Sequence, residues 1–221
     1  MNLKTSVLVI ILSILFSSLY AQDPDTYLYR KMDTSKPLEE YGYANAEGKM
    51  IIPFGKYPYV YMDTMKTIGF VRTNNRGIWA INTKGQELFR GFTLDNGPDY
   101  VQEGLFRMYD KRGKIGFANM LGKIIIQPQY EGAFPFTDGL APVCKGCISQ
   151  KVPNGEYDQW AKGKWGYIDK TGRVVIPIEY DELHYSGKPV DGKIILKKDN
   201  VTYQFDMDSV YSAVPVTPHL H

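Results

Sequence analysis

Apolar and polar residues alternate in short runs along most of the chain, and Gly, Pro, Asn and Asp residues separate these runs. Such period-two alternation is typical of half-buried β-strands. One clear example is residues 165–169, WGYID, which predict a strand, and residues 173–177, RVVIP, which predict a second strand that ends at Pro177. Gly172 lies in the turn between them, where glycine adopts positive φ without steric cost. Beyond residue 21, no stretch keeps apolar residues at helical spacing for more than about two turns.

An internal repeat of about 37 residues organises this pattern. In each copy an Asn or Asp is followed three residues later by Gly, and the first three copies are 37 residues apart. The step to the fourth copy is 50 residues, which we interpret as one repeat plus an insertion of 13. In a decayed fifth copy, Asp206 takes the Asp position and Ser209 the Gly position. The four clear pairs are Asn45 and Gly48, Asn82 and Gly85, Asn119 and Gly122, and Asp169 and Gly172.

The repeats predict a domain organisation. A second anchor at Gly69, Gly104 and Gly139, with a spacing of 35, places the insertion after Gly139, at about residues 145–162. We expect a signal peptide at 1–21, a capping segment at 22–40, a repeat domain at 41–212 and a C-terminal tail at 213–221. The copies begin near residues 41, 78, 115, 165 and 202.

Each copy predicts three short strands, so the expected fold is all-β, built from tandem antiparallel β-meanders. These meanders form either an open twisted array or a partly closed, propeller-like arrangement, since propeller blades usually have four strands in about 40 residues. The decayed terminal copies favour the open array, in which end units act as caps.

The fourth copy carries a family resemblance. It combines the KWGYID core with Gly172, an aliphatic run that ends at Pro177, and the pair Tyr180 and Asp181. In these features the chain resembles the WG-repeat family over about residues 41–212, most strongly in this copy. The resemblance implies an interaction scaffold without a defined activity, and it brings no catalytic residues. The positions that correspond to Trp165 in the other copies are Tyr41, Ile78, Ile115 and Thr202.

The repeated residues favour structural roles over chemical ones. We expect Trp165 to pack between its own strands and the next unit; the alternative is an exposed platform for a sugar or peptide. The Asn and Asp positions are expected to cap turns, because Asn and Asp replace one another there and a general acid or base needs a titratable group. Glu179, Asp181 and Glu182 could form a hydrolase carboxylate pair, but the copy near Tyr130 offers only Glu131.

Cys144 and Cys147 lie together in the segment that breaks the repeat. In an exported chain they are expected to form a local disulfide. Two other possibilities are a redox pair, which would need a βαβ context, and a zinc site completed by His184, His219 or His221. No phosphate-binding loop, nucleophile elbow or metalloprotease motif occurs, so we expect no cofactor and no catalytic residues.

Composition limits the partners. Residues 7–16 form an apolar run too short to span a bilayer, followed by small residues up to Ala21, which predicts cleavage there, export to the periplasm or beyond, and no stable membrane anchor afterwards. The net charge of +2 and the absence of a basic cluster argue against nucleic acid.

The expected function is therefore an exported scaffold for a protein or glycan of the cell envelope, with the insertion and its Tyr157 and Trp160 as the contact site. A neutral loop expansion is the alternative for the insertion. An envelope hydrolase that uses Asp181 and Glu182, or a purely structural component, are the alternatives for the whole chain.

Overall fold

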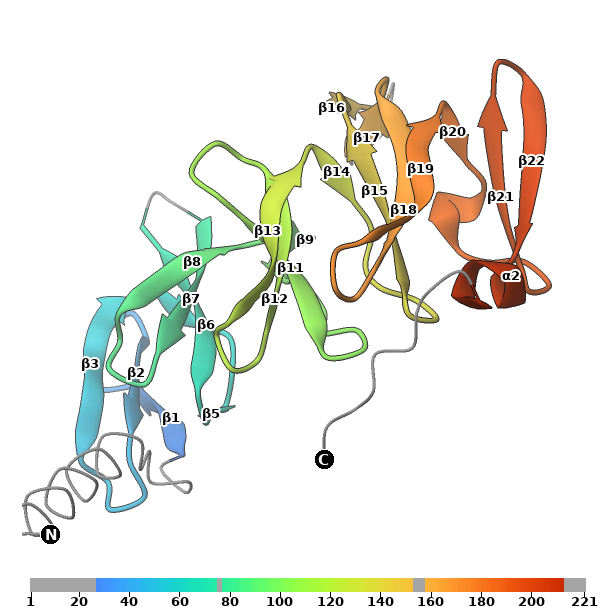
Figure 1. Ribbon diagram of the computed structural model, residues 1–221. Helices are drawn as coiled ribbons and strands as arrows, with labels where there is room; N and C mark the ends of the chain where they lie inside the picture. Colours follow the sequence, from blue (N-terminus) through green and yellow to red (C-terminus); the bar gives the residue numbers. More distant parts are fainter. Residues whose placement is uncertain (1–26, 75–76, 153–157, 213–221) are drawn as a thin grey trace, which may run out of the picture.

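The computed structural model describes residues 27–74, 77–152 and 158–212 (Figure 1). Three parts of the predicted organisation lie outside these ranges: the expected signal peptide, residues 22–26 of the expected capping segment, and the expected C-terminal tail. The described chain is nearly all β, in antiparallel sheets of which none closes into a barrel. The prediction of an all-β array of antiparallel meanders is therefore confirmed.

Five units follow one another along the array, and each of the first four contains neighbouring strands that we call a, b and c (Figure 1). Strand b contains Trp165 and Gly166 or the equivalent residues of the other units, which we call the WG position. In the fifth unit a helix replaces strand c. Strand a is β1 (Leu28–Asp33), β6 (Ile68–Thr73), β11 (Leu105–Tyr109), β15 (Leu140–Lys145) and β21 (Lys193–Lys198); strand b is β2 (Glu40–Ala44), β7 (Gly77–Asn82), β12 (Ile115–Asn119), β18 (Lys164–Asp169) and β22 (Val201–Asp206); strand c is β3 (Met50–Tyr57), β8 (Glu87–Gly91), β13 (Ile124–Tyr130) and β19 (Val174–Tyr180).

The corner, which is the segment from strand c of one unit to strand a of the next, joins the units by backbone pairing. Three corners contain a two-residue strand that pairs with strand a of the following unit: β4 with β6, β14 with β15, and β20 with β21. Consecutive units are thus linked by ladder hydrogen bonds as well as by packing. The corner elements are β4 (Tyr59–Val60), β5 (Thr64–Met65), β9 (Thr93–Leu94), β10 (Gly97–Pro98), β14 (Gly132–Ala133), β20 (Glu182–Leu183) and the 3-10 turn η1 (Tyr185–Gly187).

Strand c runs through its proline, so the prediction that Pro177 ends the strand was wrong: β19 continues to Tyr180. The register explains this, because Trp165 pairs with Tyr180 but Tyr167 pairs with Ile176, and the shift leaves Pro177 at an irregular position of the ladder. A proline is tolerated at such a bulge because no ladder hydrogen bond needs its missing N–H. A register shift also occurs at the corresponding position between β2 and β3 and between β12 and β13.

The glycine of the WG motif is required by this irregular pairing. A Cβ atom on Gly166 would lie 2.6 Å from the carbonyl oxygen of Ile176, and one on Gly42 would lie 2.5 Å from that of Ile52. At Gly116 an added Cβ would meet the backbone nitrogen of Pro128 at 2.7 Å. Strand c therefore folds closely over the glycine, and no side chain fits between them.

The second unit departs from this geometry. Trp79 occupies the glycine position, and it pairs with Arg90 while Ala80 pairs with Phe89. Its strand c, β8, contains no proline and continues into pairing with β11 of the third unit, where Gly91 lies opposite Met108. Units 2 and 3 consequently share one seven-stranded sheet, in the order β13-β12-β11-β8-β7-β6-β4.

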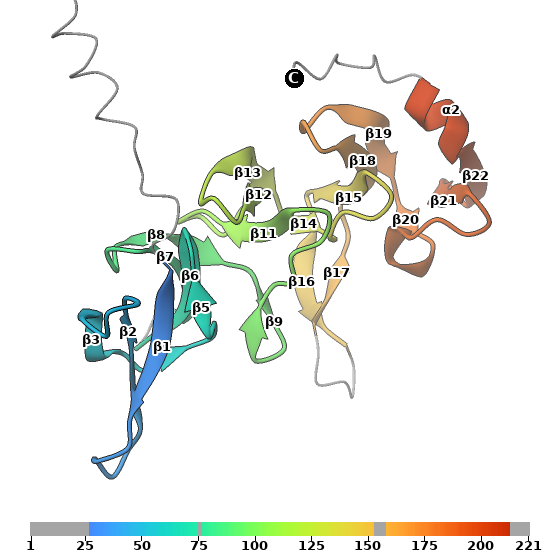
Figure 2. The same cartoon turned by 90° about the horizontal axis from the view of Figure 1, so that it is seen from below.

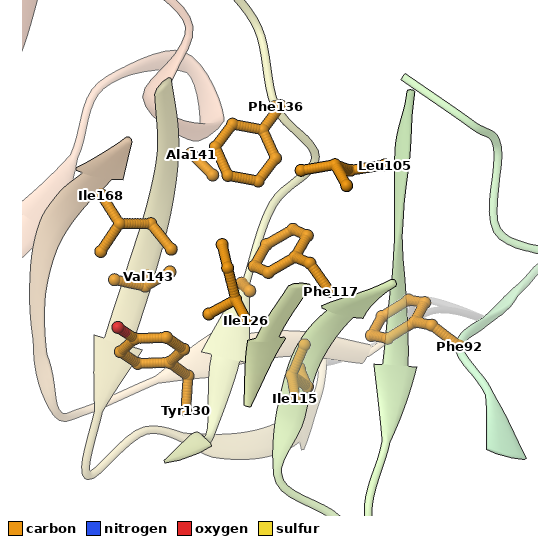
Figure 3. Close-up of a cluster of buried hydrophobic side chains, with 11 residues drawn as sticks. Phe92, Leu105, Ile115, Phe117, Ile126, Tyr130, Phe136, Ala141, Val143 and Ile168 are labelled. Atoms are coloured by element: carbon orange, nitrogen blue, oxygen red, sulfur yellow. The ribbon is translucent and has the colours of Figure 1, made fainter. Parts of the chain in front are cut away.

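The hydrophobic core lies mainly between units. Figure 3 shows one cluster in which Ile126 and Tyr130 of β13 meet Val143 of β15 and Ile168 of β18. The turn glycine of one unit also lies over the preceding unit, since an added Cβ on Gly172 would be 3.3 Å from Ile126. Each unit thus covers the apolar face of its neighbour, as expected for a repeat array.

Two details of the predicted repeat need correction. Gly104 and Gly139 have positive φ, 84° and 72°, in turns that precede strand a, whereas Gly69 lies inside β6, so the second anchor does not extend to that unit. Ser209 does not take a turn position, because it lies in helix α2 (Met207–Ser212). Met207 and Val210 of this short helix are buried in the last core cluster, where they replace the apolar side chains of strand c.

No helix in the described ranges is long and apolar enough to cross a membrane.

Candidate functional site

The repeated Asn and Asp side chains bind the turn that follows them. The Oδ1 atom of Asp169 accepts hydrogen bonds from the backbone N–H groups of Thr171 (2.9 Å) and Arg173 (3.1 Å). The backbone carbonyl of Asp169 accepts the N–H of Gly172 at 2.9 Å, and Gly172 has a φ of 87°. This geometry needs only an oxygen acceptor, so an amide and a carboxylate serve equally. Asn82 and Asn119 make the same two Oδ1 contacts, and Asn45 accepts the N–H of Lys49; the glycines with positive φ are Gly48, Gly85 and Gly122.

Asp169 makes a pH-dependent contribution to the stability of the fold, which the Asn residues of the other copies cannot make. Burial acts to raise the pKa of its carboxyl group, but hydrogen bonds from Thr171 and Arg173 outweigh burial and hold the pKa below its ordinary value. A carboxyl group whose pKa is lowered by folding stabilises the fold above its unfolded pKa of about 3.9, and this contribution is lost as the pH falls through the folded pKa.

We therefore expect Asp169→Asn to lower the free energy of unfolding at pH 7, and we expect this difference to become smaller once the pH falls below the unfolded pKa of Asp. Urea unfolding of both proteins at pH 7 and at about pH 2, below the unfolded Asp value, measures this. An equal difference between the two proteins at both pH values would show that the ionised carboxylate contributes nothing.

Trp165 is part of the core. It is 5% exposed, it pairs with Cys144 on one neighbouring strand and with Tyr180 on the other, and its ring centroid lies 5.6 Å from that of Phe134. Ile78 and Ile115, at the same position of other units, are also buried, whereas Thr202 is exposed on the last strand. In units 2, 3 and 4 the side chain at this position is therefore packed in the core, whereas in unit 5 it is exposed to solvent.

The tyrosine of the WGY sequence ties its unit to the next corner. The hydroxyl group of Tyr167 donates a hydrogen bond to the carbonyl of Gly187 at 2.8 Å, and that of Tyr43 donates to Met62 at 2.8 Å. Burial raises the pKa of both phenols, that of Tyr43 to about 12, so both remain neutral donors. In unit 3 Phe117 replaces the tyrosine and packs on Phe136 with ring centroids 4.8 Å apart.

The corner carboxylates form ion pairs. Lys164, just before Trp165, contacts Asp181, just after Tyr180, and in unit 3 Lys114 contacts Glu131 in the same way. The hydrogen bond from Lys164, together with one from the backbone N–H of Asp199, lowers the pKa of Asp181. A general acid needs a raised pKa, so this environment does not prepare Asp181 to donate a proton.

The other two corner carboxylates are also paired. Glu182 contacts Lys197 at 3.2 Å, and Glu179 contacts Lys198 at 3.2 Å. Both carboxylates are thus held in ion pairs with lysines, and they do not resemble a catalytic pair.

The insertion forms a β-hairpin between strands a and b of unit 4, made of β16 (Ile148–Lys151) and β17 (Asp158–Ala161). A disulfide between Cys144 and Cys147, with Cα atoms 6.0 Å apart, closes the base of this hairpin. Tyr157 lies outside the described residues. Within the described ranges no group of three or more His, Cys, Asp or Glu side chains is placed to hold a metal ion, and His219 and His221 lie outside those ranges.

Trp160 anchors the hairpin to the array. A Cβ atom on Gly132 would lie 3.2 Å from Cδ2 of the indole, so the ring lies directly against the backbone of β14. Partly buried, Trp160 packs against both the core cluster between units 3 and 4 and the cluster that contains Trp165.

A groove of about 980 Å³ runs beside the hairpin. Figure 2 shows the segment with β9 and the hairpin of β16 and β17 projecting on the same side of the array, and both line this groove. Its walls come from units 3 and 4, the insertion and three corners. The lining residues are Phe92, Thr93, Leu94, Asp95, Arg107, Tyr109, Phe134, Ser149, Lys151, Gln159, Trp160, Trp165, Asp181, Glu182, Leu183 and Ser186.

A buried ion pair supports one wall of the groove. The guanidinium group of Arg107 donates to both carboxylate oxygens of Asp99, at 2.9 and 2.6 Å, and to the carbonyl of Ala133 at 2.9 Å. Arg107 also lies 3.8 Å from the ring centroid of Phe92, which stacks on Tyr109 at 5.0 Å. Sequence reasoning missed this arrangement; the signal was a charged residue inside the apolar strand LFRMY.

A second, mainly apolar pocket of about 500 Å³ lies under the loop of β9 and β10, where Met62, Phe70 and Met120 form part of its wall. Tyr100, at its rim, is 67% exposed.

Comparison with known proteins agrees with the unit geometry. The family described as WG containing repeat matches residues 41–64, 115–146 and 165–201, which cover the glycine and proline positions of units 1, 3 and 4. The unmatched second unit is the one in which Trp79 replaces the glycine. No curated protein matches the sequence. The three matches identify the chain as a β-repeat protein with WG containing repeats.

Proposed function

We propose that the protein is an exported β-repeat scaffold that binds a protein or glycan of the cell envelope in the groove beside the insertion hairpin. The observation that supports this most directly is the groove itself. Ligand clefts in proteins typically measure about 300–1,000 Å³ and combine aromatic walls with a few polar groups. The groove has this size and mixture, and the one insertion that interrupts the repeat builds part of it.

The hairpin is suited to recognition because it is a single-copy element on a repeated frame. Lys151 and Gln159 are exposed on it, and the disulfide and Trp160 fix its base. A frame that holds a variable loop in place is the usual arrangement for binding surfaces. A hydrolase is not favoured, because Asp181 and Glu182 are engaged in ion pairs.

The test compares the full chain with the double variant Lys151→Ala/Gln159→Ala. These side chains are exposed, so the variant is expected to fold normally and to lose envelope components that the wild-type chain retains on an affinity column. The matched control is Lys31→Ala/Gln102→Ala, which changes the same residue types away from the groove and should retain them. Identical sets of bound components for all three proteins would contradict the proposal.

A further inference from the structure

We infer that the ligand of the groove is an uncharged saccharide chain that stacks on Trp160. This inference rests on the proposed function and narrows the ligand from a protein or glycan to one class. Three features support it: an aromatic ring that lies against the backbone, a lining whose charges balance, and polar groups suited to bind hydroxyls.

The aromatic surface comes from Trp160. Its indole lies against Gly132, where an added Cβ would be 3.2 Å from Cδ2 and 3.3 Å from Cγ, and the side chain also lines the groove. Sugar rings present a face of C–H groups that packs against a flat aromatic ring, and the hydroxyl groups at the sugar's edge remain available for hydrogen bonds. An indole held in place by backbone loses little conformational freedom when a ligand stacks on it.

The charges that line the groove balance one another. Asp181 contacts Lys164, Glu182 contacts Lys197, and Arg107 contacts Asp99. The remaining lining charges are Asp95 and Lys151, which have opposite signs. A charged ligand would need an unpaired counter-charge, and these ion pairs provide none. The lining therefore favours a neutral ligand.

Polar groups that recognise hydroxyls surround the aromatic surface. The carboxylates of Asp95 and Glu182 offer acceptors, and the amide of Gln159 offers both donors and an acceptor. Thr93 and Ser186 add exposed hydroxyl groups on the opposite wall and the next corner. Neighbouring hydroxyls of a sugar match such planar carboxylate and amide groups, which bind two partners at once.

The hairpin meets the groove with side chains. Ser149 pairs with Trp160 across the hairpin, and Lys151 lies two residues beyond Ser149, so these three side chains share one face. All three line the groove.

The test is titration of the full chain, by calorimetry, with four neutral hexasaccharides: cellohexaose, chitohexaose, maltohexaose and xylohexaose. We expect at least one to bind, Trp160→Phe to retain binding, and Trp160→Ala to weaken it at least about tenfold, which corresponds to the loss of a strong aromatic contact. Tyr100→Ala, which removes an exposed aromatic ring outside the groove, is the matched control and should bind as the wild type does.

The outcomes separate this inference from the proposed function. If no hexasaccharide binds but Lys151→Ala/Gln159→Ala still loses an envelope protein on the column, the groove is a protein site and the saccharide inference is wrong. If a hexasaccharide binds equally to Trp160→Ala and to the wild type, the stacking site is refuted. Thermal unfolding of Trp160→Ala and Trp160→Phe shows whether each variant is folded, and the Gln159→Ala variant, expected to bind more weakly, tests the same site without touching the core.

Discussion

Replacing Asp99 by Asn is expected to lower the free energy of unfolding by about 3–5 kcal/mol, the range found when one partner of a buried ion pair is removed. The side chains of Arg107 and Asp99 are 6% and 2% exposed, so the substitution leaves a buried guanidinium group without its counter-charge. Asn has nearly the shape of Asp, and the loss therefore reports charge and not packing. Chemical denaturation monitored by circular dichroism measures it.

Two controls accompany this measurement. The double variant Asp99→Leu/Arg107→Met removes both charges, and we expect it to recover part of the lost stability, because no unpaired charge remains. Glu179→Gln breaks the exposed pair with Lys198 and should leave the unfolding midpoint unchanged. If Asp99→Asn unfolds at the wild-type midpoint, the pair is not what stabilises this wall of the groove.

Gly116→Ala is expected to destabilise the protein by about 3 kcal/mol, because an added methyl group overpacks the site where strand c crosses the WG glycine. The new Cβ would lie 2.7 Å from the backbone nitrogen of Pro128, and backbone atoms yield less easily than a flexible side chain. Unfolding in urea gives the difference in midpoint.

Gly97→Ala is the matched control, since nothing lies within 4 Å of its added Cβ and its φ is not positive. We expect this variant to be as stable as the wild type. Equal stability of Gly116→Ala and Gly97→Ala would mean that the close approach of the strands does not require glycine.

The sequence was sufficient to predict the all-β fold, because the alternation along each strand and the recurring turns are local signals, and the decayed terminal copies favoured the open arrangement. The role of the turn residues could also be predicted, because Asn119 and Asp169 bind backbone groups within four residues of themselves. The course of strand c was not predictable from local rules. Pro177 would normally end a strand, and only its pairing with β18 shows that a shift in register accommodates it.

The groove could be predicted only in part. The insertion and Trp160 were recognisable because they interrupt a repeat, whereas the opposite wall comes from residues such as Phe92 and Asp95, which lie far from them in sequence. The buried pair of Arg107 and Asp99 depends on how one corner folds back onto strand a, and a single sequence does not reveal that contact.

The sheet shared by units 2 and 3 makes those two units one stiff block, while unit 4 is joined to it through a short corner strand, a core cluster and the exposed pair of Lys170 and Glu103. The groove takes one wall from this block and the other from the hairpin of unit 4. Its width is therefore set by the angle between them. A ligand that bridges both walls would fix the local curvature of the array. Binding in the groove and bending of the array would then be coupled.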